Sequence, residues 1–294
     1  MNPLAPLPSE AVDVGRGRQV QVYDSQTSPS DVTLLFVHGS MASFDQFRYQ
    51  IALLQFAQPT RVVAYDAYGC GKSPRPRDWD SYSTENHMED LRVLFDKYKS
   101  ARNLLCAHSF GTTLALRLTA ERKGEIAGVA CLGAALREDG GPGIFKLPLF
   151  VLEWVQPWLS RAFIKRAFHA DTLARTTDHH KHVVEHAEVR SGTNDMHVAQ
   201  AFYRQWVWTR QPLIATIAAP TRVCFICGSH DELAPMEHVE EIISWFSDKS
   251  IVSVHVVSPA GHQLMEEQPE EVNRLLAEFF AQCLAPSTNA VSVL

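Results

Sequence analysis

Ser109, Asp231 and His262 are residues of the types that carry out nucleophilic catalysis together. Ser109 lies in the stretch 107–111, Ala-His-Ser-Phe-Gly, which follows an apolar run and precedes a helical pattern. A serine on a tight turn between a strand and a helix exposes its hydroxyl, and the helix N-terminus behind it favours developing negative charge. Alanine replaces the first glycine of the usual Gly-x-Ser-x-Gly pattern, so we expect more backbone strain at Ala107.

A serine nucleophile needs a base and a carboxylate that orients the base. Asp231 follows an expected strand at 221–227, and His262 follows an expected strand at 251–257. Reacting groups collect at the carboxyl ends of parallel strands. We therefore predict a catalytic triad in which Ser109 attacks, His262 is the base and Asp231 holds the imidazole.

Two turns are expected to supply donors for the oxyanion. The backbone N–H of Phe110 begins the helix after the serine, and that of Ser40 lies in a turn after another apolar run. We predict that these two groups form the oxyanion hole. We interpret His38 and His108, which lie beside them in the sequence, as structural residues.

The elements that must position these residues alternate along the chain. Continuous apolar runs predict buried strands, and apolar residues at helical spacing predict helices between them. Repeated strand-helix units indicate the α/β class, with a mostly parallel central sheet and helices on both faces. Strands are expected at 18–23, 32–37, 61–65, 103–107, 126–132, 221–227 and 251–257, and helices near 47–56, 85–100, 110–116 and 236–246 and from Pro269 onward.

Residues 135–213 break this alternation. A Gly-rich hinge precedes the densely apolar stretch 144–168. This stretch is interrupted too often for a membrane span, by Pro148, Glu153, Pro157, Arg161 and Lys165. Short amphipathic helices that cap an apolar, closable pocket are expected; alternatively, these residues only complete a helical subdomain core. The predicted domains are an α/β core of residues 1–134 and 214–294 and a helical cap (lid) of residues 135–213.

Composition limits the partners and the compartment. The 294 residues carry a net charge of -6, so nothing in the overall charge favours nucleic acid or an anionic membrane. The six cysteines are scattered, as is typical of reduced, buried residues, and residues 1–24 contain no secretory or membrane-anchor pattern. We expect a cytoplasmic protein. The C-terminal Ser292-Val293-Leu294 lacks the central base of a peroxisomal signal, so peroxisomal targeting is not expected.

From about residue 33 to 280 the sequence resembles the α/β-hydrolase superfamily. The matching pieces are 38–40, 66–73, the turn at Ser109, 228–231 and 261–262, and the chain order of Ser109, Asp231 and His262 is that of the superfamily triad. Within the superfamily, the cap stretch from 145–148 through 163–165 is similar to that of the abhydrolase domain-containing protein 8 group. The resemblance implies a serine hydrolase without a metal or an organic cofactor.

Three other signals compete with this interpretation. The run 71–73, Gly-Lys-Ser, lacks the earlier glycine of a phosphate-binding loop because Asp66 stands there. The helical spacing of His179, His182 and His186 could suit a metal, but a solvated cap surface is favoured. Glu267 stands where some relatives, proposed as acyltransferases, carry aspartate, and an acid there also suits a helix N-terminus.

The predicted function is hydrolysis of a carboxylic ester or thioester through an acyl-enzyme, in the manner of a carboxylesterase or lipase. The expected partner is a small apolar ester, bound in a pocket lined by cap aromatics that include Phe202, Tyr203, Trp206 and Trp208. Acyl transfer and carbon-carbon bond hydrolysis are alternatives on the same triad. A non-catalytic interaction protein is the alternative from another class. Transient contact of the cap with a membrane or lipid is a further hypothesis.

Overall fold

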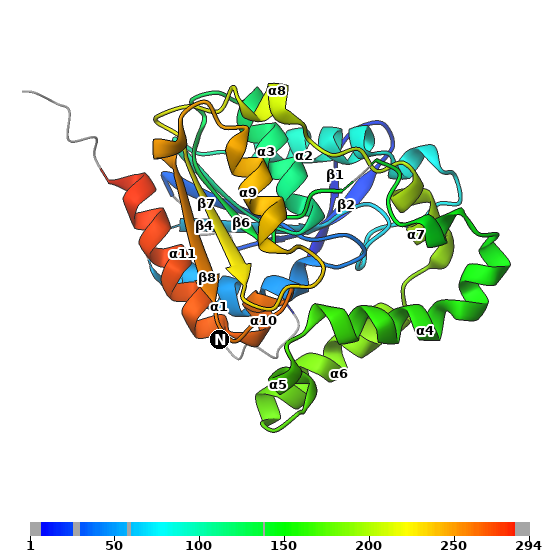
Figure 1. Ribbon diagram of the computed structural model, residues 1–294. Helices are drawn as coiled ribbons and strands as arrows, with labels where there is room; N and C mark the ends of the chain where they lie inside the picture. Colours follow the sequence, from blue (N-terminus) through cyan, green and yellow to red (C-terminus); the bar gives the residue numbers. More distant parts are fainter. Residues whose placement is uncertain (1–6, 26–29, 58–59, 138, 286–294) are drawn as a thin grey trace, which may run out of the picture.

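The computed structural model describes residues 7–25, 30–57, 60–137 and 139–285. Its centre is an eight-stranded sheet with the strand order β1-β2-β4-β3-β5-β6-β7-β8 (Figure 1). β1 and β2 are antiparallel to their neighbours, and the strands from β4 to β8 are parallel. The strands are β1 Glu10–Asp13, β2 Gln19–Asp24, β3 Val32–Val37, β4 Thr60–Asp66, β5 Arg102–His108, β6 Ile126–Leu132, β7 Arg222–Gly228 and β8 Val252–Val257. The sheet confirms the predicted class.

Helices cover both faces of the sheet. One layer contains α1, α10 and α11, and the opposite layer contains α2, α3, α8 and α9 (Figure 1). The helices are α1 Arg48–Ala57, α2 Thr84–Tyr98, α3 Phe110–Glu121, α4 Leu149–Ala167, α5 Ala170–Leu173, α6 Asp178–Gly192, α7 Met196–Arg204, α8 Gln211–Ile214, α9 Met236–Ser244, α10 Leu264–Glu267 and α11 Pro269–Leu284. Short 3-10 turns are η1 Phe44–Phe47, η2 Asp80–Tyr82, η3 Gly143–Lys146 and η4 Lys249–Ile251.

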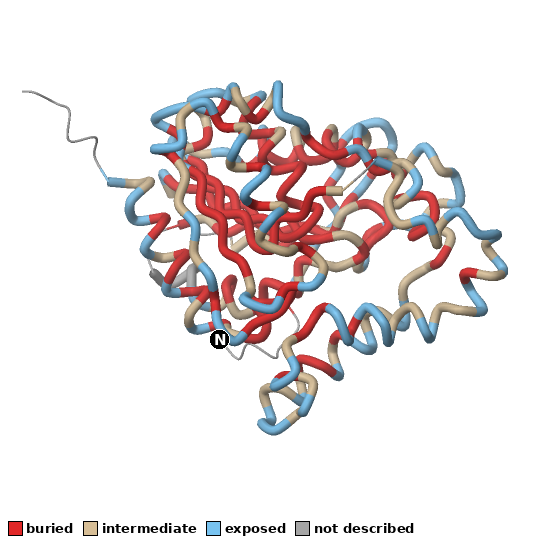
Figure 2. The backbone as a smooth tube through the Cα atoms, viewed as in Figure 1, coloured by how far each residue is buried: buried red, intermediate tan, exposed pale blue. Residues whose placement is uncertain are grey.

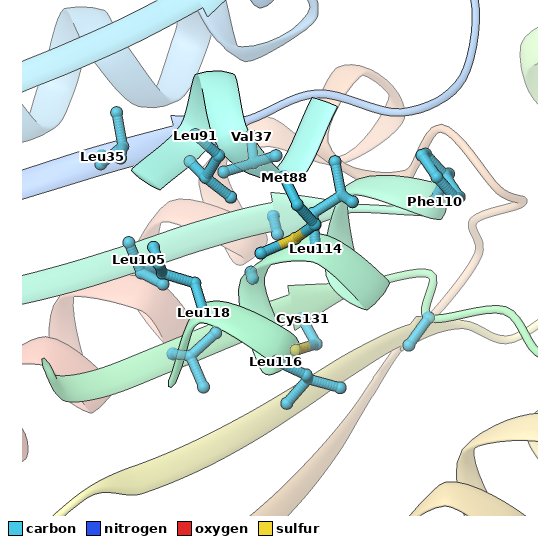
Figure 3. Packing of buried hydrophobic residues seen from close by; sticks show 14 of the residues in the cluster. Leu35, Val37, Met88, Leu91, Leu105, Phe110, Leu114, Leu116, Leu118 and Cys131 are labelled. Atoms are coloured by element: carbon cyan, nitrogen blue, oxygen red, sulfur yellow. The ribbon is translucent and has the colours of Figure 1, made fainter. Parts of the chain in front are cut away.

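The inner strands are apolar along their whole length because both faces of the sheet are covered. All six residues of β3 are buried, as expected for a parallel strand between two helical layers. Leu35 and Val37 of β3 belong to one packed cluster with Met88 of α2 and Leu114 of α3 (Figure 3). Phe36 belongs to the cluster on the other face. Successive side chains of β3 therefore point to opposite faces of the sheet and pack in two separate hydrophobic clusters.

Local signals in the sequence predicted several element ends correctly. The side chain of Ser83 accepts a hydrogen bond from the N–H of Asn86 and caps α2. Pro269 occupies the first position of α11, where its missing N–H costs nothing. The strand β1 was not predicted, because it has only four residues and buries only one of them, Val12.

The segment between β6 and β7 projects from the sheet as a layer of helices (Figure 1). Short helices were expected in 144–168, but α4 is one helix of 19 residues that contains Pro157. Pro157 lies on the exposed side of α4, and the helix continues through it. α4 packs along α6 and against α7. Among the described residues, no helix has both the length and the apolarity that a membrane crossing requires. We use "cap segment" for residues 135–213; its boundaries remain predictions.

Candidate active site

Ser109 joins β5 to α3 in a strained conformation. Its φ is 52° and its ψ is -122°, a region that residues other than glycine rarely adopt. The strain was expected at Ala107, but Ala107 is an ordinary buried residue of β5 and the positive φ falls on the serine itself. A Cβ on Gly111 would lie 2.4 Å from the carbonyl oxygen of Val37, so α3 approaches β3 closely here. The turn raises the serine at the carboxyl end of β5.

Asp231 and His262 follow β7 and β8 and meet above the sheet. The Nδ1 atom of His262 lies 2.8 Å from Oδ2 of Asp231. The other carboxylate oxygen, Oδ1, accepts hydrogen bonds from the N–H groups of Leu233 (2.9 Å) and Ala234 (2.7 Å). Burial alone would raise the pKa of Asp231, but the His262 ring and these hydrogen bonds outweigh it and hold the pKa below its usual range. The carboxylate therefore stays ionised beside His262.

All three predicted triad residues are buried at one edge of the sheet. Ser109 and His262 line the same cavity, and Asp231 lies behind His262. Gly133 at the end of β6 makes room for this pair, because a Cβ there would lie 3.1 Å from Nδ1 of His262. Ser109 thus lies at the same edge as two residues that follow it in the sequence by more than 120 positions.

The two turns that were expected to donate to an oxyanion lie next to Ser109. A Cβ built on Gly39 would be 3.2 Å from Cβ of Ser109, so the turn after β3 runs against the serine. Ser40 lines the cavity, and its hydroxyl accepts a hydrogen bond from the hydroxyl of Tyr203 (3.1 Å). Phe110 is the first residue of α3, where a helix leaves its N–H groups without helical partners. The assignment of both N–H groups to an oxyanion hole remains a prediction.

His38 and His108 hold the backbone around the serine. Nε2 of His38 accepts from the N–H of Ala67 (2.8 Å), and Nδ1 donates to the carbonyl of Gly39 (2.6 Å). Burial lowers the pKa of His38 to about 4, so its ring is neutral. Nε2 of His108 donates to the carbonyl of His262 (2.9 Å). These contacts agree with the structural roles inferred from the sequence.

A cavity of about 340 Å³ lies over Ser109, between the sheet edge and the cap segment. Its walls are mostly apolar, and those from the cap segment include Ile144, Phe145, Leu159, Phe163, Met196, Tyr203, Trp206 and Trp208. The prediction that cap aromatics face the cavity is correct for Tyr203, Trp206 and Trp208. Phe202 is an exception, because it packs against Phe110 with ring centroids 5.1 Å apart and is not part of the lining.

The cavity also offers polar atoms that have no protein partner. Buried side-chain atoms without a hydrogen bond among the described residues include Nδ1 of His108, Nε1 of Trp206, Nε1 of Trp208 and Oε1 of Gln263, and all four residues line the cavity. A buried polar atom left unpaired costs on the order of 1–3 kcal/mol. Because these atoms are shielded from solvent, their side chains would have to turn before the atoms could contact a ligand in the cavity.

The carboxylate of Asp66 stabilises the turn 66–73 by accepting backbone hydrogen bonds. Oδ1 of Asp66 accepts from the N–H of Phe44 (2.9 Å), and Oδ2 accepts from the N–H of Lys72 (2.8 Å). A Cβ on Gly71 would lie 2.1 Å from the Asp66 carboxylate, so the carboxylate fills the place that a phosphate would need. Burial raises the pKa of Asp66 to about 6. The turn is structural, as the sequence indicated.

Glu267 ties the catalytic histidine loop to the cap segment. Its Oε1 accepts from the N–H of Gly261 (2.8 Å), next to His262. Its Oε2 accepts from the N–H of His169 (2.7 Å) and the hydroxyl of Thr172 (2.8 Å). The sequence singled out Glu267 as the position where some relatives, proposed as acyltransferases, carry aspartate, and as an acid suited to a helix N-terminus. Its bonds to the cap segment were missed, because no local pattern predicts which cap residues dock there.

Glu266 binds a second part of the cap segment. Its carboxylate pairs with Arg190 of α6 through two contacts of 2.9 and 3.3 Å, and its carbonyl lies 2.9 Å from Nε2 of His179. On the same helix, Nε2 of His186 lies 3.0 Å from Oδ2 of Asp45, a residue of the α/β part of the chain. The prediction that His179, His182 and His186 lie on a solvated surface is therefore wrong, because they are half-buried where α6 meets the α/β core. Among the described residues, no group of three or more His, Cys, Asp or Glu could hold a metal ion.

The fold and the arrangement at its edge define the class of this chain. It belongs to the alpha/beta hydrolase fold family, whose profile matches residues 32–269. Protein ABHD8 of Homo sapiens is 26% identical over 265 residues, which are 89% of this chain and 58% of that protein. The chain thus spans less than two-thirds of the length of this relative. The resemblance expected from the sequence is confirmed.

Two solved structures are similar in fold. The enol-lactonase from Burkholderia xenovorans LB400 has a TM-score of 0.78 and 20% sequence identity, and the match covers 93% of this chain and 100% of that chain. A thermophilic esterase from Thermogutta terrifontis has a TM-score of 0.76 and 18% identity, with coverage of 95% and 100%. At these identities the likeness concerns the fold.

Proposed function

We propose that this protein is a serine hydrolase that cleaves a carboxylic ester or thioester with a largely apolar acyl chain. The observation that carries the proposal is the meeting of Ser109 and His262 in one apolar cavity, with Asp231 bonded to Nδ1 of His262. The names of the esterase and the enol-lactonase with the same fold support the same reaction class.

In this mechanism the hydroxyl oxygen of Ser109 attacks the carbonyl carbon while Nε2 of His262 takes the hydroxyl proton. Asp231 keeps Nδ1 protonated and stabilises the imidazolium. The N–H groups of Phe110 and Ser40 bind the oxyanion. The tetrahedral intermediate collapses as His262 gives its proton to the leaving alcohol or thiol. Water then attacks the acyl-enzyme, His262 acts again as base, and the free acid leaves.

A fluorophosphonate probe tests whether Ser109 is an activated nucleophile. Wild-type protein should be labelled at Ser109, and Ser109→Ala should not be labelled. Ser160→Ala is the matched control, because Ser160 lines the same cavity and its hydroxyl only donates to the carbonyl of Ser191 (3.2 Å). Equal labelling of wild type and Ser109→Ala would reject the enzyme and favour a non-catalytic interaction protein.

The length of the acyl chain tests the substrate class. Each buried methylene contributes up to about 0.8 kcal/mol, so kcat/KM for p-nitrophenyl esters should rise by one to two orders of magnitude from acetate until the cavity is full. Ala199 is buried and lines the cavity, so Ala199→Leu should move the optimum to shorter chains. Ala281→Leu, at an exposed position of α11, is the control. A flat or falling series below the micelle concentrations would reject the apolar acyl chain.

A further inference from the structure

The helix α4 has two different faces. Leu159, Phe163 and Arg166 line the cavity on the inner side. On the outer side, Phe150, Trp154 and Trp158 are 72%, 78% and 70% exposed. These three residues are four apart in sequence, so they form one continuous stripe along two turns of the helix. Along α4, only Leu152, Ile164 and Ala167 are buried, and most of the helix is coloured as exposed or intermediate in Figure 2.

The exposed side chains of Phe150, Trp154 and Trp158 form an apolar surface that a binding partner would bury. The rings of Trp154 and Trp158 have centroids 6.5 Å apart and contact each other rather than the cap interior. Trp206 and Trp208, in contrast, are almost fully buried. Large exposed apolar patches mark interaction surfaces, and tryptophan in particular favours the boundary between lipid headgroups and acyl chains.

Basic residues continue the stripe toward the end of the helix. Arg161 and Lys165 are exposed and fall on the same helical face as Trp154 and Trp158. Both also line a small pocket with Glu188 of α6, whose carboxylate pairs with Arg175. Glu153 is the one acidic residue in the sequence of α4, so the helix is basic although the whole chain has a net charge of -6.

We propose that the outer face of α4 docks on a lipid bilayer that contains anionic headgroups. Phe150, Trp154 and Trp158 enter the headgroup and acyl boundary, and Arg161 and Lys165 bind lipid phosphates. The helix lies in the plane of the membrane surface, with the cavity on its other side. A second copy of the chain is the competing occupant of this face, and the oligomeric state in solution distinguishes it from a bilayer. The proposal does not depend on the reactivity of Ser109.

Binding to vesicles tests the aromatic stripe. Wild-type protein should sediment with vesicles of phosphatidylcholine and 30% phosphatidylserine, and its tryptophan emission should shift to the blue. Trp154→Ala/Trp158→Ala should bind at least tenfold more weakly and lose the emission shift. Val189→Ala is the matched control, since Val189 is an exposed apolar residue of α6 outside the stripe. Equal binding of the double variant and wild type, or no binding of wild type, would overturn the proposal.

The charges are tested separately. Each basic side chain near an anionic surface contributes about 1 kcal/mol, so Arg161→Gln/Lys165→Gln should bind the anionic vesicles roughly tenfold to thirtyfold more weakly. On vesicles of phosphatidylcholine alone, this variant should bind like wild type. A loss of equal size on both vesicles would contradict the assigned role of the charges.

Two further measurements separate this proposal from others. In analytical ultracentrifugation, wild-type protein and Trp154→Ala/Trp158→Ala should have the same oligomeric state. If wild-type protein forms a dimer that the double variant loses, and does not bind vesicles, the face is an interface between copies and the proposal is overturned. Ser109→Ala should bind vesicles like wild type. The double variant should hydrolyse soluble esters at the wild-type rate, because neither tryptophan lines the cavity. Failure of the proposed hydrolysis and failure of the membrane proposal are thus distinguishable.

Discussion

The two carboxylate oxygens of Asp231 have separate tasks. Oδ1 is held by backbone N–H groups in its own turn, which leaves Oδ2 to accept from Nδ1 of His262. Backbone donors fix the carboxylate more firmly than side chains would, because they cannot rotate away. The orientation of the imidazole is therefore set by the turn after β7.

The first prediction concerns this contact. Asp231→Asn should lower kcat on the order of 10³ to 10⁴-fold, because an amide favours the wrong histidine tautomer. The fold should survive, since Asn can still accept the backbone hydrogen bonds through its carbonyl. Steady-state kinetics with circular dichroism measures both effects, and Asp171→Asn, at an exposed cap residue, is the control. Near-normal turnover would mean that Asp231 does not orient His262.

Glu267 gives the second prediction, on pH. Burial raises the pKa of Glu267 to about 7, although the hydrogen bonds from His169, Thr172 and Gly261 oppose the shift. The folded state therefore favours the neutral acid. Its contribution to the free energy of unfolding is complete below the unfolded pKa near 4.5 and is lost as pH rises through about 7.

The variant Glu267→Gln removes this titration. Its free energy of unfolding relative to wild type should increase between pH 5 and pH 8, by on the order of 1–3 kcal/mol at about 1.4 kcal/mol per pKa unit. Urea unfolding at several pH values measures the difference. For Glu270→Gln, at an exposed residue of α11, the free energy of unfolding should change with pH in the same way as that of wild type. A pH slope in Glu267→Gln equal to that of wild type would contradict the prediction.

At the scale of elements, the contact between α3 and β3 holds the serine turn. A Cβ on Gly111 would lie 2.4 Å from the carbonyl oxygen of Val37 and 2.6 Å from that of His38. Both are backbone atoms, so the helix must move as a body to make room. The same carbonyls lie beside the turn that contains Ser40, and a shift would reach both expected oxyanion donors.

We therefore predict that Gly111→Ala destabilises the protein by about 1–3 kcal/mol, as overpacking does, and abolishes fluorophosphonate labelling. Gly143→Ala is the control, because a Cβ at Gly143 would have no atom within 4 Å. Urea unfolding and labelling on the same samples check both parts. Wild-type labelling in Gly111→Ala would show that the turn tolerates displacement of α3.

The elements also show what a sequence can predict. Ser109, Asp231 and His262 each follow a strand, so the parallel sheet that was expected places them at one edge without further information. The length of α4 was mispredicted because a proline inside a helix removes one backbone hydrogen bond without necessarily ending the helix. Arg190 and Glu266 could not be paired from the sequence, since their contact depends on how α6 docks on the core.

On the scale of the whole molecule, cap and core are joined through the catalytic histidine loop. The N–H of Gln263 donates to the carbonyl of Ala167 at the end of α4 (3.1 Å), and a Cβ on Gly261 would lie 2.8 Å from that same oxygen. Glu266 and Glu267 add the bonds to α6 and α5 already described. Hydrogen bonds of Gln263, Glu266 and Glu267 thus join the loop around His262 to cap residues.

The fourth prediction follows from this connection. Arg190→Leu leaves the Glu266 carboxylate buried without its ion-pair partner, and breaking a buried pair in this way costs about 3–5 kcal/mol. Because the loss is local to the cap contact, residual activity should fall at a lower temperature than the far-UV circular dichroism signal. Arg175→Leu, in an exposed pair with Glu188, should not separate the two curves. Superimposed curves in Arg190→Leu would contradict the prediction.

The two neighbouring glutamates also limit how such a protein could change its specificity. A different cap inserted at the same two points of the sheet would bring a new pocket, but it would have to offer a cation to Glu266 and donors to Glu267. A transplant without them would leave buried acids unpaired beside His262. Cap and histidine loop therefore pack as one unit, and we expect that exchanging the pocket for that of a homologue requires moving residues 261–267 with the cap.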